Sequence, residues 1–167
     1  SWHRYRVGER WQRPRRQASL VLGTGRDLYI CFNAREIEVL RTPSVRERIL
    51  ATRLGPDLVH PGTDPALAVA RARALLDGSD PLIDLLLDQR VAAGIGNVYK
   101  SEVLFIEALS PWMTLQRITD EALARCFDVA ADRLRKNLGG GRRVTRFEND
   151  GAGRLWVYGR AGKPCLK

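Results

Sequence analysis

The sequence predicts an α+β fold, with an antiparallel β meander in the first third of the chain and helices through most of the rest. Residues 1–60 contain short apolar segments with β-branched or alternating side chains, and turn residues separate these segments. From about residue 63 onward, the apolar residues recur at helical spacing instead. Two prolines and two glycines gather near residues 55–63, which marks a boundary between the two parts.

The meander begins with a predicted hairpin. Residues 18–22 and 28–32 are apolar and partly β-branched, and the intervening GTGRD segment has the composition of a turn. Residues 36–40 (EIEVL) alternate polar and apolar side chains, as expected of a half-buried strand. The dipeptide Thr42-Pro43 ends this third strand, because proline has no amide hydrogen to donate to a strand ladder.

The first two predicted helices share a start signal, an aspartate followed by a proline. Asp64-Pro65 precedes a helix that runs to Leu76, with Asp64 as the cap and Pro65 in the first turn. Asp80-Pro81 precedes a second helix over residues 82–93. This helix is apolar almost all round, so we expect it to be buried at the centre of the domain.

Two further helices and a strand complete the prediction. Asn97 is expected to cap a third helix that ends near Ala108, and Thr119 to open a fourth that runs to Leu138. Residues 154–158 are expected to form a short strand followed by a glycine-rich turn. The predicted helical core comprises Leu82, Leu85, Leu86, Val103, Leu104, Leu123, Phe127 and Leu134.

The composition excludes several classes of protein. Hydrophobic residues make up 44% of the chain and charged residues 28%, which is typical of globular proteins. No apolar run approaches the roughly 18–20 residues that span a bilayer, and no apolar core of a secretory signal is visible. The cysteines Cys31, Cys126 and Cys165 are far apart and form no C-x-x-C pair, which indicates a reducing compartment rather than a disulfide framework.

The charge favours a polyanionic partner. The formal net charge is +9, and residues 1–60 and 111–167 each carry +6, whereas residues 61–110 carry −3. Only four of the 28 cations are lysine, and arginine suits bidentate contacts to phosphate. Two basic flanks are therefore expected to grip a nucleic acid. An arginine-rich solvated surface would explain the same charge.

The segment of residues 88–102 has the pattern of a phosphate clamp of the helix–two-turn–helix kind. Gly94 and Gly96 permit a sharp turn and close approach of a ligand. The next helix starts at Asn97, and the free amides of a helix N-terminus bind anions. Lys100 lies one turn further on. A plain helical hairpin with a glycine-rich turn is the alternative reading.

Several segments, in order along the chain, resemble the formamidopyrimidine-DNA glycosylase/endonuclease VIII family, and they are closer to the endonuclease VIII branch. The resemblance runs nearly from end to end. It rests on Trp2, on RLGPD (53–57), on LDQ (87–89), AGIGNVY (93–99) and EVLF (102–105), and on WVYGR (156–160) and GKPC (162–165).

The resemblance implies an architecture of three parts. Residues 1–58 would be the C-terminal part of an antiparallel β-sandwich, residues 59–150 a helix–two-turn–helix DNA-binding domain, and residues 151–167 a lead-in strand with the first part of a truncated zinc finger. Zinc is implied for the full-length protein, with Cys165 as one ligand, and no cofactor is expected for this chain alone.

The resemblance also implies a function in base-excision repair. Members are DNA glycosylases with AP-lyase activity on oxidised bases, here expected to be pyrimidines, and their partner is double-stranded DNA with a damaged base or an abasic site. We expect a monomer in the bacterial cytoplasm, associated with the nucleoid. The rival reading is a non-catalytic nucleic-acid-binding protein with the same helical motif.

Site residues follow from the same resemblance. The expected DNA contacts are Arg53, Gly94, Gly96, Asn97, Lys100 and Arg160. The family's catalytic proline, glutamate and lysine would lie before residue 1, so no catalytic residue is assigned, and this chain is expected to bind DNA without catalysis. A nucleophilic Ser1 is the alternative.

Other polar residues are given plainer roles. His3 and His60 are expected at the surface or in loops, and Cys126 on the apolar face of the fourth helix. Asp84 and Asp88 are expected on one helix face, where capping or hydrogen bonding suits them better than acid–base work. The cations Arg142, Arg143 and Arg146 follow three glycines and are read either as a solvated loop or as a mobile basic loop near the lesion pocket.

Overall fold

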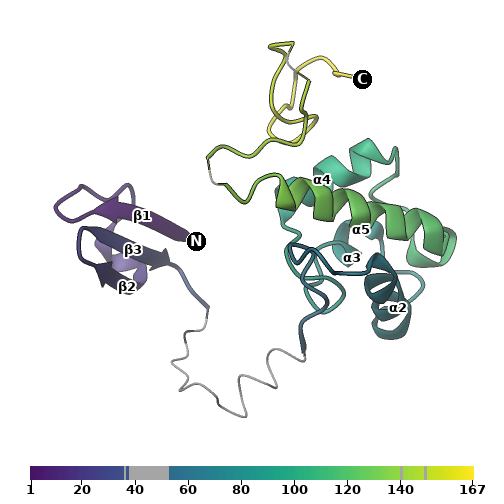
Figure 1. Cartoon of the computed structure of the whole chain (residues 1–167), viewed down its shortest axis with the longest axis horizontal. Coiled ribbons are helices and arrows are strands. Elements are labelled where there is room, and N and C mark those ends of the chain that lie inside the picture. The colour runs from purple at the N-terminus through teal and green to yellow at the C-terminus, as the bar shows by residue number, and fades with distance from the viewer. Residues whose placement is uncertain (36, 38–52, 140, 149) are drawn as a thin grey trace. The chain divides into compact units, whose positions relative to one another are not determined.

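The computed structural model describes residues 1–35, 37, 53–139, 141–148 and 150–167. The chain divides into two units, Ser1–Glu47 and Arg48–Lys167 (Figure 1). The first contains a sheet and the second the helices, so the predicted α+β class is confirmed.

The first unit is a three-stranded antiparallel sheet in the order β1-β3-β2. The predicted hairpin is confirmed as β2 (Ala18–Thr24) and β3 (Asp27–Phe32). The strand β1 (Trp2–Arg6) was not predicted from the sequence, because its WHRYR sequence has little apolar content and becomes a strand by pairing with β3. A 3-10 turn, η1 (Arg15–Gln17), precedes β2. Apart from residue 37, the predicted strand at 36–40 lies outside the described residues.

A small aromatic cluster holds this sheet together. Tyr5, Ile30 and Phe32 are buried, and Trp11 packs against them from the loop after β1. The rings of Trp11 and Phe32 meet edge to face, with centroids 6.0 Å apart, which is a favoured aromatic geometry.

The first and last helices match their predicted start signals. In α2 (Pro65–Leu75), the Asp64 side chain accepts a hydrogen bond from the Ala66 amide. In α5 (Asp120–Arg135), the Thr119 hydroxyl accepts from the Ala122 amide. Both caps are local sequence features and need no tertiary contact to form. A second 3-10 turn, η2 (Leu115–Arg117), lies between α4 (Asn97–Ile106) and α5.

The second predicted helix is much shorter than expected. The helix α3 spans only Leu82–Leu85, and turns replace the helix expected over residues 86–93. The side chains of Asp88 and Gln89 hydrogen-bond to nearby backbone groups and offer the chain an alternative to helical hydrogen bonds. The segment is nevertheless buried as predicted, because Leu86, Val91 and Ala92 enter the core.

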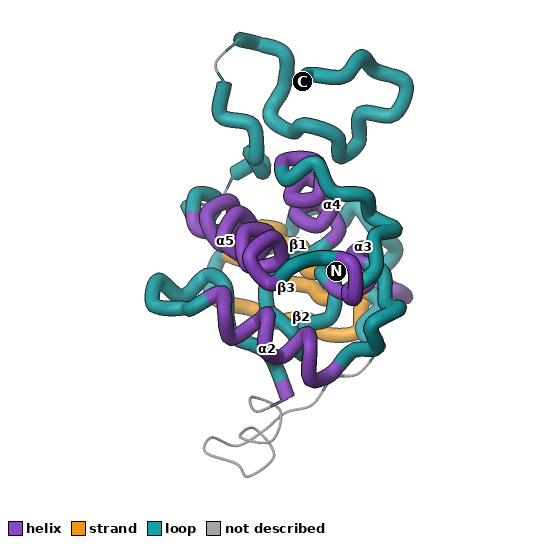
Figure 2. The backbone as a smooth tube through the Cα atoms, turned by 90° about the vertical axis from the view of Figure 1, so that its right-hand side faces the viewer, coloured by secondary structure: helices purple, strands orange, loops and turns teal. Residues whose placement is uncertain are grey.

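The core lies between α2, α3, α4 (Asn97–Ile106) and α5, with α5 packed against both α2 and α4. Figure 2 shows these helices gathered together and the C-terminal segment running entirely as loop. The predicted core residues are buried, except that Leu134 is only partly buried at the edge. The strand expected over residues 154–158 is absent from the described structure.

The segment that precedes the helices packs with them. The Gly55 amide donates to the Gln89 carbonyl at 2.8 Å, and the Ala93 amide donates to the Pro56 carbonyl at 2.9 Å. Leu58 is fully buried in the helical core. By packing, residues 53–58 therefore belong to the helical unit, although the boundary drawn from the sequence placed them with the sheet.

Candidate functional site

The two turns between α3 and α4 are held by side chains. The Asp88 carboxylate accepts the Arg90 amide at 2.9 Å and pairs with the Arg90 guanidinium at 2.6 Å. This hydrogen bonding lowers the pKa of Asp88 below its usual value. Asp88 thus stabilises the first turn, as the non-catalytic reading expected, but it shares no helix with Asp84, because α3 ends at Leu85.

The Gln89 side chain spans the second turn. Its Nε2 donates to the carbonyls of Leu87 at 3.0 Å and Ile95 at 2.9 Å, and its Oε1 accepts the Gly94 amide at 3.0 Å. One amide group therefore fixes both ends of the turn that precedes α4. This role of Gln89 could not be predicted from the sequence, because a hydrogen bond from position 89 to position 95 follows no helical or strand period.

Gly94 is required by the backbone conformation of this turn. Its φ angle is +114°, which side-chain-bearing residues rarely adopt, and a Cβ there would lie 3.2 Å from Leu134 Cδ1. Nothing lies within 4 Å of the Cβ position of Gly96, so the chain is open to solvent just before α4.

The N-terminus of α4 carries no side-chain cap. Gly96 is the cap residue, whereas Asn97 is the first residue of the helix, so the predicted capping role of Asn97 is wrong. The Asn97 Oδ1 instead accepts a hydrogen bond from Lys100 Nζ at 3.2 Å. No acidic residue lies in the first turn. Free amides and a lysine therefore face the same end of the helix, which is a favourable place for an anion.

Arg143 adds positive charge near this turn. Burial raises the pKa of Tyr99 in the first turn of α4, and the positive charge of Arg143 opposes that rise. Arg142 and Arg143 are exposed, in agreement with a basic loop.

Arg146 does not belong to a mobile basic loop. Its side chain is 6% exposed and pairs with Glu148 at 3.0 Å and with Asp150. The guanidinium also lies 4.9 Å from the centre of the Trp156 ring. Arg146 is a buried structural cation whose partners come from the following residues.

A buried carboxylate explains why residues 154–158 form no strand. Glu102, fully buried on α4, accepts the amides of Trp156, Val157 and Tyr158 at 2.7, 2.9 and 2.8 Å. It also accepts the Thr145 hydroxyl. These amides are thus satisfied by a side chain rather than by a neighbouring strand.

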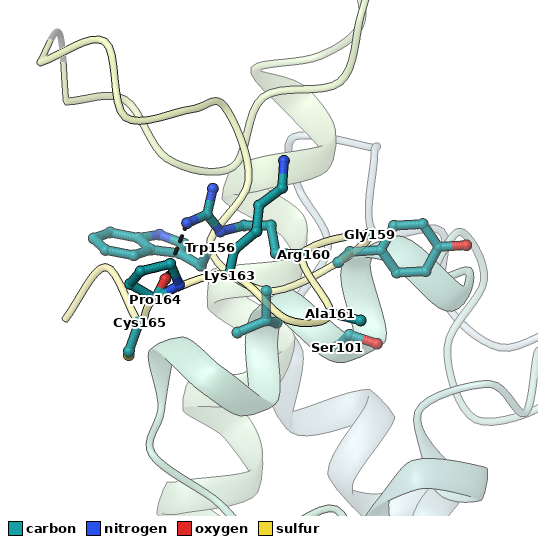
Figure 3. A pocket seen from close by; sticks show the side chains of 10 residues that line it. Ser101, Trp156, Gly159, Arg160, Ala161, Lys163, Pro164 and Cys165 are labelled. Carbon is teal, nitrogen blue, oxygen red and sulfur yellow. Dashed lines mark hydrogen bonds between the residues drawn. The ribbon is translucent and has the colours of Figure 1, made fainter.

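Arg160 lies beside a surface pocket of about 540 Å³. Its guanidinium donates to the carbonyls of Ala152 at 3.2 Å and Pro164 at 3.1 Å. Figure 3 shows the Arg160 side chain crossing the pocket between Trp156 and Lys163, with Ser101 on the α4 side. The Ser101 hydroxyl donates to the Asn97 carbonyl at 3.0 Å, so the pocket adjoins the first turn of α4.

The described residues do not provide a zinc site. Cys165 is exposed at the edge of the same pocket. A tetrahedral zinc site needs four ligands, and no group of three or more His, Cys, Asp or Glu residues among the described residues is placed to hold a metal ion.

The remaining predicted site residues lie elsewhere. Arg53 is exposed at the start of the segment that packs on the turns. The Ser1 nitrogen donates to the Phe32 carbonyl at 2.7 Å, alongside the pairing of β1 with β3. The Ser1 hydroxyl lies 3.2 Å from His3 Nε2. His60 Nδ1 accepts the Gly62 amide in an exposed turn.

None of the helices in the described part of the chain is both long and apolar enough to cross a membrane.

Comparison with known proteins gives a consistent result. The model of the formamidopyrimidine-DNA glycosylase H2TH domain matches residues 54–148. A probable endonuclease 8 2 of Streptomyces coelicolor is 37% identical over 100% of this chain and 59% of its own length. The DNA-(apurinic or apyrimidinic site) lyase Nei2 of Mycolicibacterium smegmatis is 35% identical over 98% of this chain and 62% of its own length. The chain thus spans about 60% of these relatives.

Solved structures agree on the fold. Thermus thermophilus MutM (Fpg) matches with a TM-score of 0.65 and 31% identity, over 92% of this chain and 61% of that one. Lactococcus lactis Fpg, non-covalently bound to DNA containing an AP site, matches with a TM-score of 0.68 at 22% identity, over 100% and 61% of the two chains. The family model covers residues 54–148, which is more than half of this chain and includes both turns and the open start of α4. The chain therefore belongs to the formamidopyrimidine-DNA glycosylase family.

Proposed function

We propose that this chain binds the phosphate backbone of double-stranded DNA at the first turn of α4. The observation that carries the proposal is the uncapped helix N-terminus, with Lys100 beside it, inside the matched domain. Helix-end amides and a lysine bind phosphate oxygens through charge-assisted hydrogen bonds. Gly96 leaves room for the backbone of the nucleic acid to approach.

The whole protein is proposed to be a DNA glycosylase with AP-lyase activity on oxidised bases, with pyrimidines preferred. The names of the Streptomyces and Mycolicibacterium relatives support this activity, and the bound AP-site DNA of the Lactococcus structure supports the type of partner. We further propose that the whole protein acts as a monomer on the bacterial nucleoid in the cytoplasm. Its cysteine-rich finger would hold zinc, with Cys165 as one ligand.

The binding proposal is tested by titrating this chain against a duplex that contains a tetrahydrofuran abasic analogue. We expect Asn97→Ala and Lys100→Ala each to weaken binding by about 1–3 kcal/mol, for all sequences alike, because phosphate contacts position the protein and do not read bases. Lys100→Ala should also reduce the slope of log K against log salt by about 1. The matched control is Arg117→Ala, which removes an exposed cation from η2. Equal affinities for all variants would disprove the site.

The activity proposal is tested with the whole protein by borohydride trapping on an abasic duplex. Reduction converts a Schiff base between an enzyme amine and the sugar into a stable adduct, so a lyase gives a cross-linked band. Binding without any trapped adduct would instead support the non-catalytic alternative.

A further inference from the structure

The helical unit contains a buried carboxylate, that of Glu102, which has no part in the proposed phosphate site. The side chain is fully buried, and burial of a charge is costly unless hydrogen bonds compensate it. Here three consecutive backbone amides, those of residues 156–158, and one hydroxyl all donate to its two oxygens. Backbone amides that converge in this way form an anion-binding site, and here the bound anion is the Glu102 carboxylate of the protein itself.

We propose that Glu102 is a positioning residue for DNA binding, which holds Arg160 beside the phosphate site at the start of α4. The inference rests on the proposed function. Glu102 and Asn97 lie on the same helix, so the carboxylate ties the segment that carries Arg160 to the element that carries the phosphate site. At least 54 positions of sequence separate Glu102 from the residues whose amides it accepts.

Hydrogen bonds of its backbone and side chain restrict the position of Arg160. Its backbone amide donates to the Val157 carbonyl at 3.1 Å, and Val157 is the middle one of the three residues held by Glu102. Its guanidinium uses donors on two carbonyls and retains others of its five N–H groups for a ligand. Arg160 also lines the same pocket as Ser101, which bonds to Asn97.

Two further contacts show that the segment is seated along α4 rather than held at one point. The rings of Phe105 and Trp156 lie 5.8 Å apart. Lys167 Nζ donates to the Ile106 carbonyl at 3.1 Å, at the last turn of the helix. These contacts can retain the segment loosely when the carboxylate is neutralised, and the loss expected from a Glu102 variant is therefore a loss of position rather than of the whole segment.

The test is a pair of double-mutant cycles on binding of this chain to the tetrahydrofuran duplex. Glu102→Gln keeps the shape of the side chain but replaces one acceptor oxygen by an NH₂ donor. We expect it to weaken binding about tenfold, the value of one charge-assisted contact. Adding Arg160→Ala to it should cost less than about twofold more, because the arginine is already displaced. Adding Asn97→Ala should multiply the loss, because that contact is independent.

Amide hydrogen exchange gives a second measurement on the same proteins. In Glu102→Gln, we expect the amides of residues 156–158 to exchange at least about tenfold faster, while those of Phe127 and Ala130 in α5 are unchanged. A purely structural role of Glu102 would speed exchange in α5 as well and would weaken binding additively with both partners. If Glu102→Gln lowers the helical circular dichroism signal, Glu102→Asp replaces it, because it keeps the charge but shortens the reach.

The outcomes separate this inference from the proposed function. Additive losses for Glu102→Gln and Arg160→Ala, or unchanged exchange at residues 156–158, would overturn the positioning role while Asn97→Ala still weakens binding. If Asn97→Ala has no effect but the cycle between Glu102 and Arg160 is non-additive, the proposed phosphate site on α4 is wrong, and so is the part of the inference that places Arg160 beside that site.

Discussion

Gly55 lies so close to the backbone of Val91 that a Cβ built on Gly55 would be 2.3 Å from the Val91 carbonyl oxygen. The Gly55 amide meanwhile donates to the Gln89 carbonyl at 2.8 Å. The approach is possible only because residue 55 has no side chain, and it brings the entering chain against the turns that precede α4.

Gly55→Ala is therefore expected to destabilise the helical unit by about 1–3 kcal/mol, as overpacking against backbone atoms typically does. Urea unfolding followed by circular dichroism measures the change. Gly139→Ala is the control, because nothing lies within 4 Å of its Cβ position, and it should change stability by less than about 0.5 kcal/mol. Equal stabilities for the two variants would show that the Gly55 contact relaxes at no cost.

Ala108→Gly is expected to stabilise the protein by about 0.5 kcal/mol. Ala108 has a φ angle of +54° just after α4, a position that usually favours glycine, and the Leu109 amide closes the helix end on the Leu104 carbonyl at 2.9 Å. Relief of strain outweighs the added freedom of the unfolded chain. In the control, Ala70→Gly in the exposed middle of α2, stability should instead fall by about 0.5–1 kcal/mol. If the melting temperature of Ala108→Gly is lower than that of the parent chain, the backbone at Ala108 is not strained.

Cysteine labelling should distinguish buried from exposed thiols. Burial raises the pKa of Cys126 to about 12, so almost no thiolate is present at neutral pH. Cys165 is exposed. We expect iodoacetamide to modify Cys165 in the native chain at pH 7.5 while Cys126 reacts only after denaturant is added, as read by peptide mass spectrometry. Rapid native labelling of Cys126 would mean that the α5 core opens readily.

The folding stability of the chain should depend on pH through the ion pair between Arg146 and Asp150. Hydrogen bonds from Arg146 hold the pKa of Asp150 well below its usual 3.8. Because the folded pKa is lower than the unfolded one, the contribution of the pair is present above about pH 4 and is lost as pH falls towards the folded pKa.

The variant for this effect is Asp150→Asn, with Asp128→Asn as a control that removes an exposed charge from α5. We expect the urea midpoint of Asp150→Asn to lie below that of the parent chain at pH 7, and the gap to narrow below pH 4. A gap of the same size at pH 3 and pH 7 would contradict the assignment.

The caps of α2 and α5 were predicted correctly from the sequence, whereas features that depend on distant residues were not. Asp64 and Thr119 cap their helices through residues two or three positions away, so their patterns could be read directly. The early end of α3 depends on Gln89, whose amide binds a carbonyl six residues on. The missing strand near the end depends on Glu102, more than 50 residues earlier in the chain.

The same distinction applies to the candidate site. The glycines and Lys100 form one continuous motif, and the structure keeps them together at the start of α4. Arg146 looked equivalent to Arg142 and Arg143 in the sequence, but its burial follows from Asp150 and from the Trp156 ring, which no spacing rule connects to it. The charge pattern of the sequence predicts a basic loop. It does not distinguish cations that bind ligands from cations that stabilise the fold.

The packing of residues 53–58 sets where the helical domain can be cut out as a recombinant fragment. A fragment that starts at residue 59 would lack Leu58, which fills part of the core, and the Pro56 carbonyl that accepts the Ala93 amide. The turns before α4 would then face water on one side, and their backbone groups would lose partners. A fragment that starts at residue 53 keeps this packing, and with it the rigidity of the loop from which α4 begins.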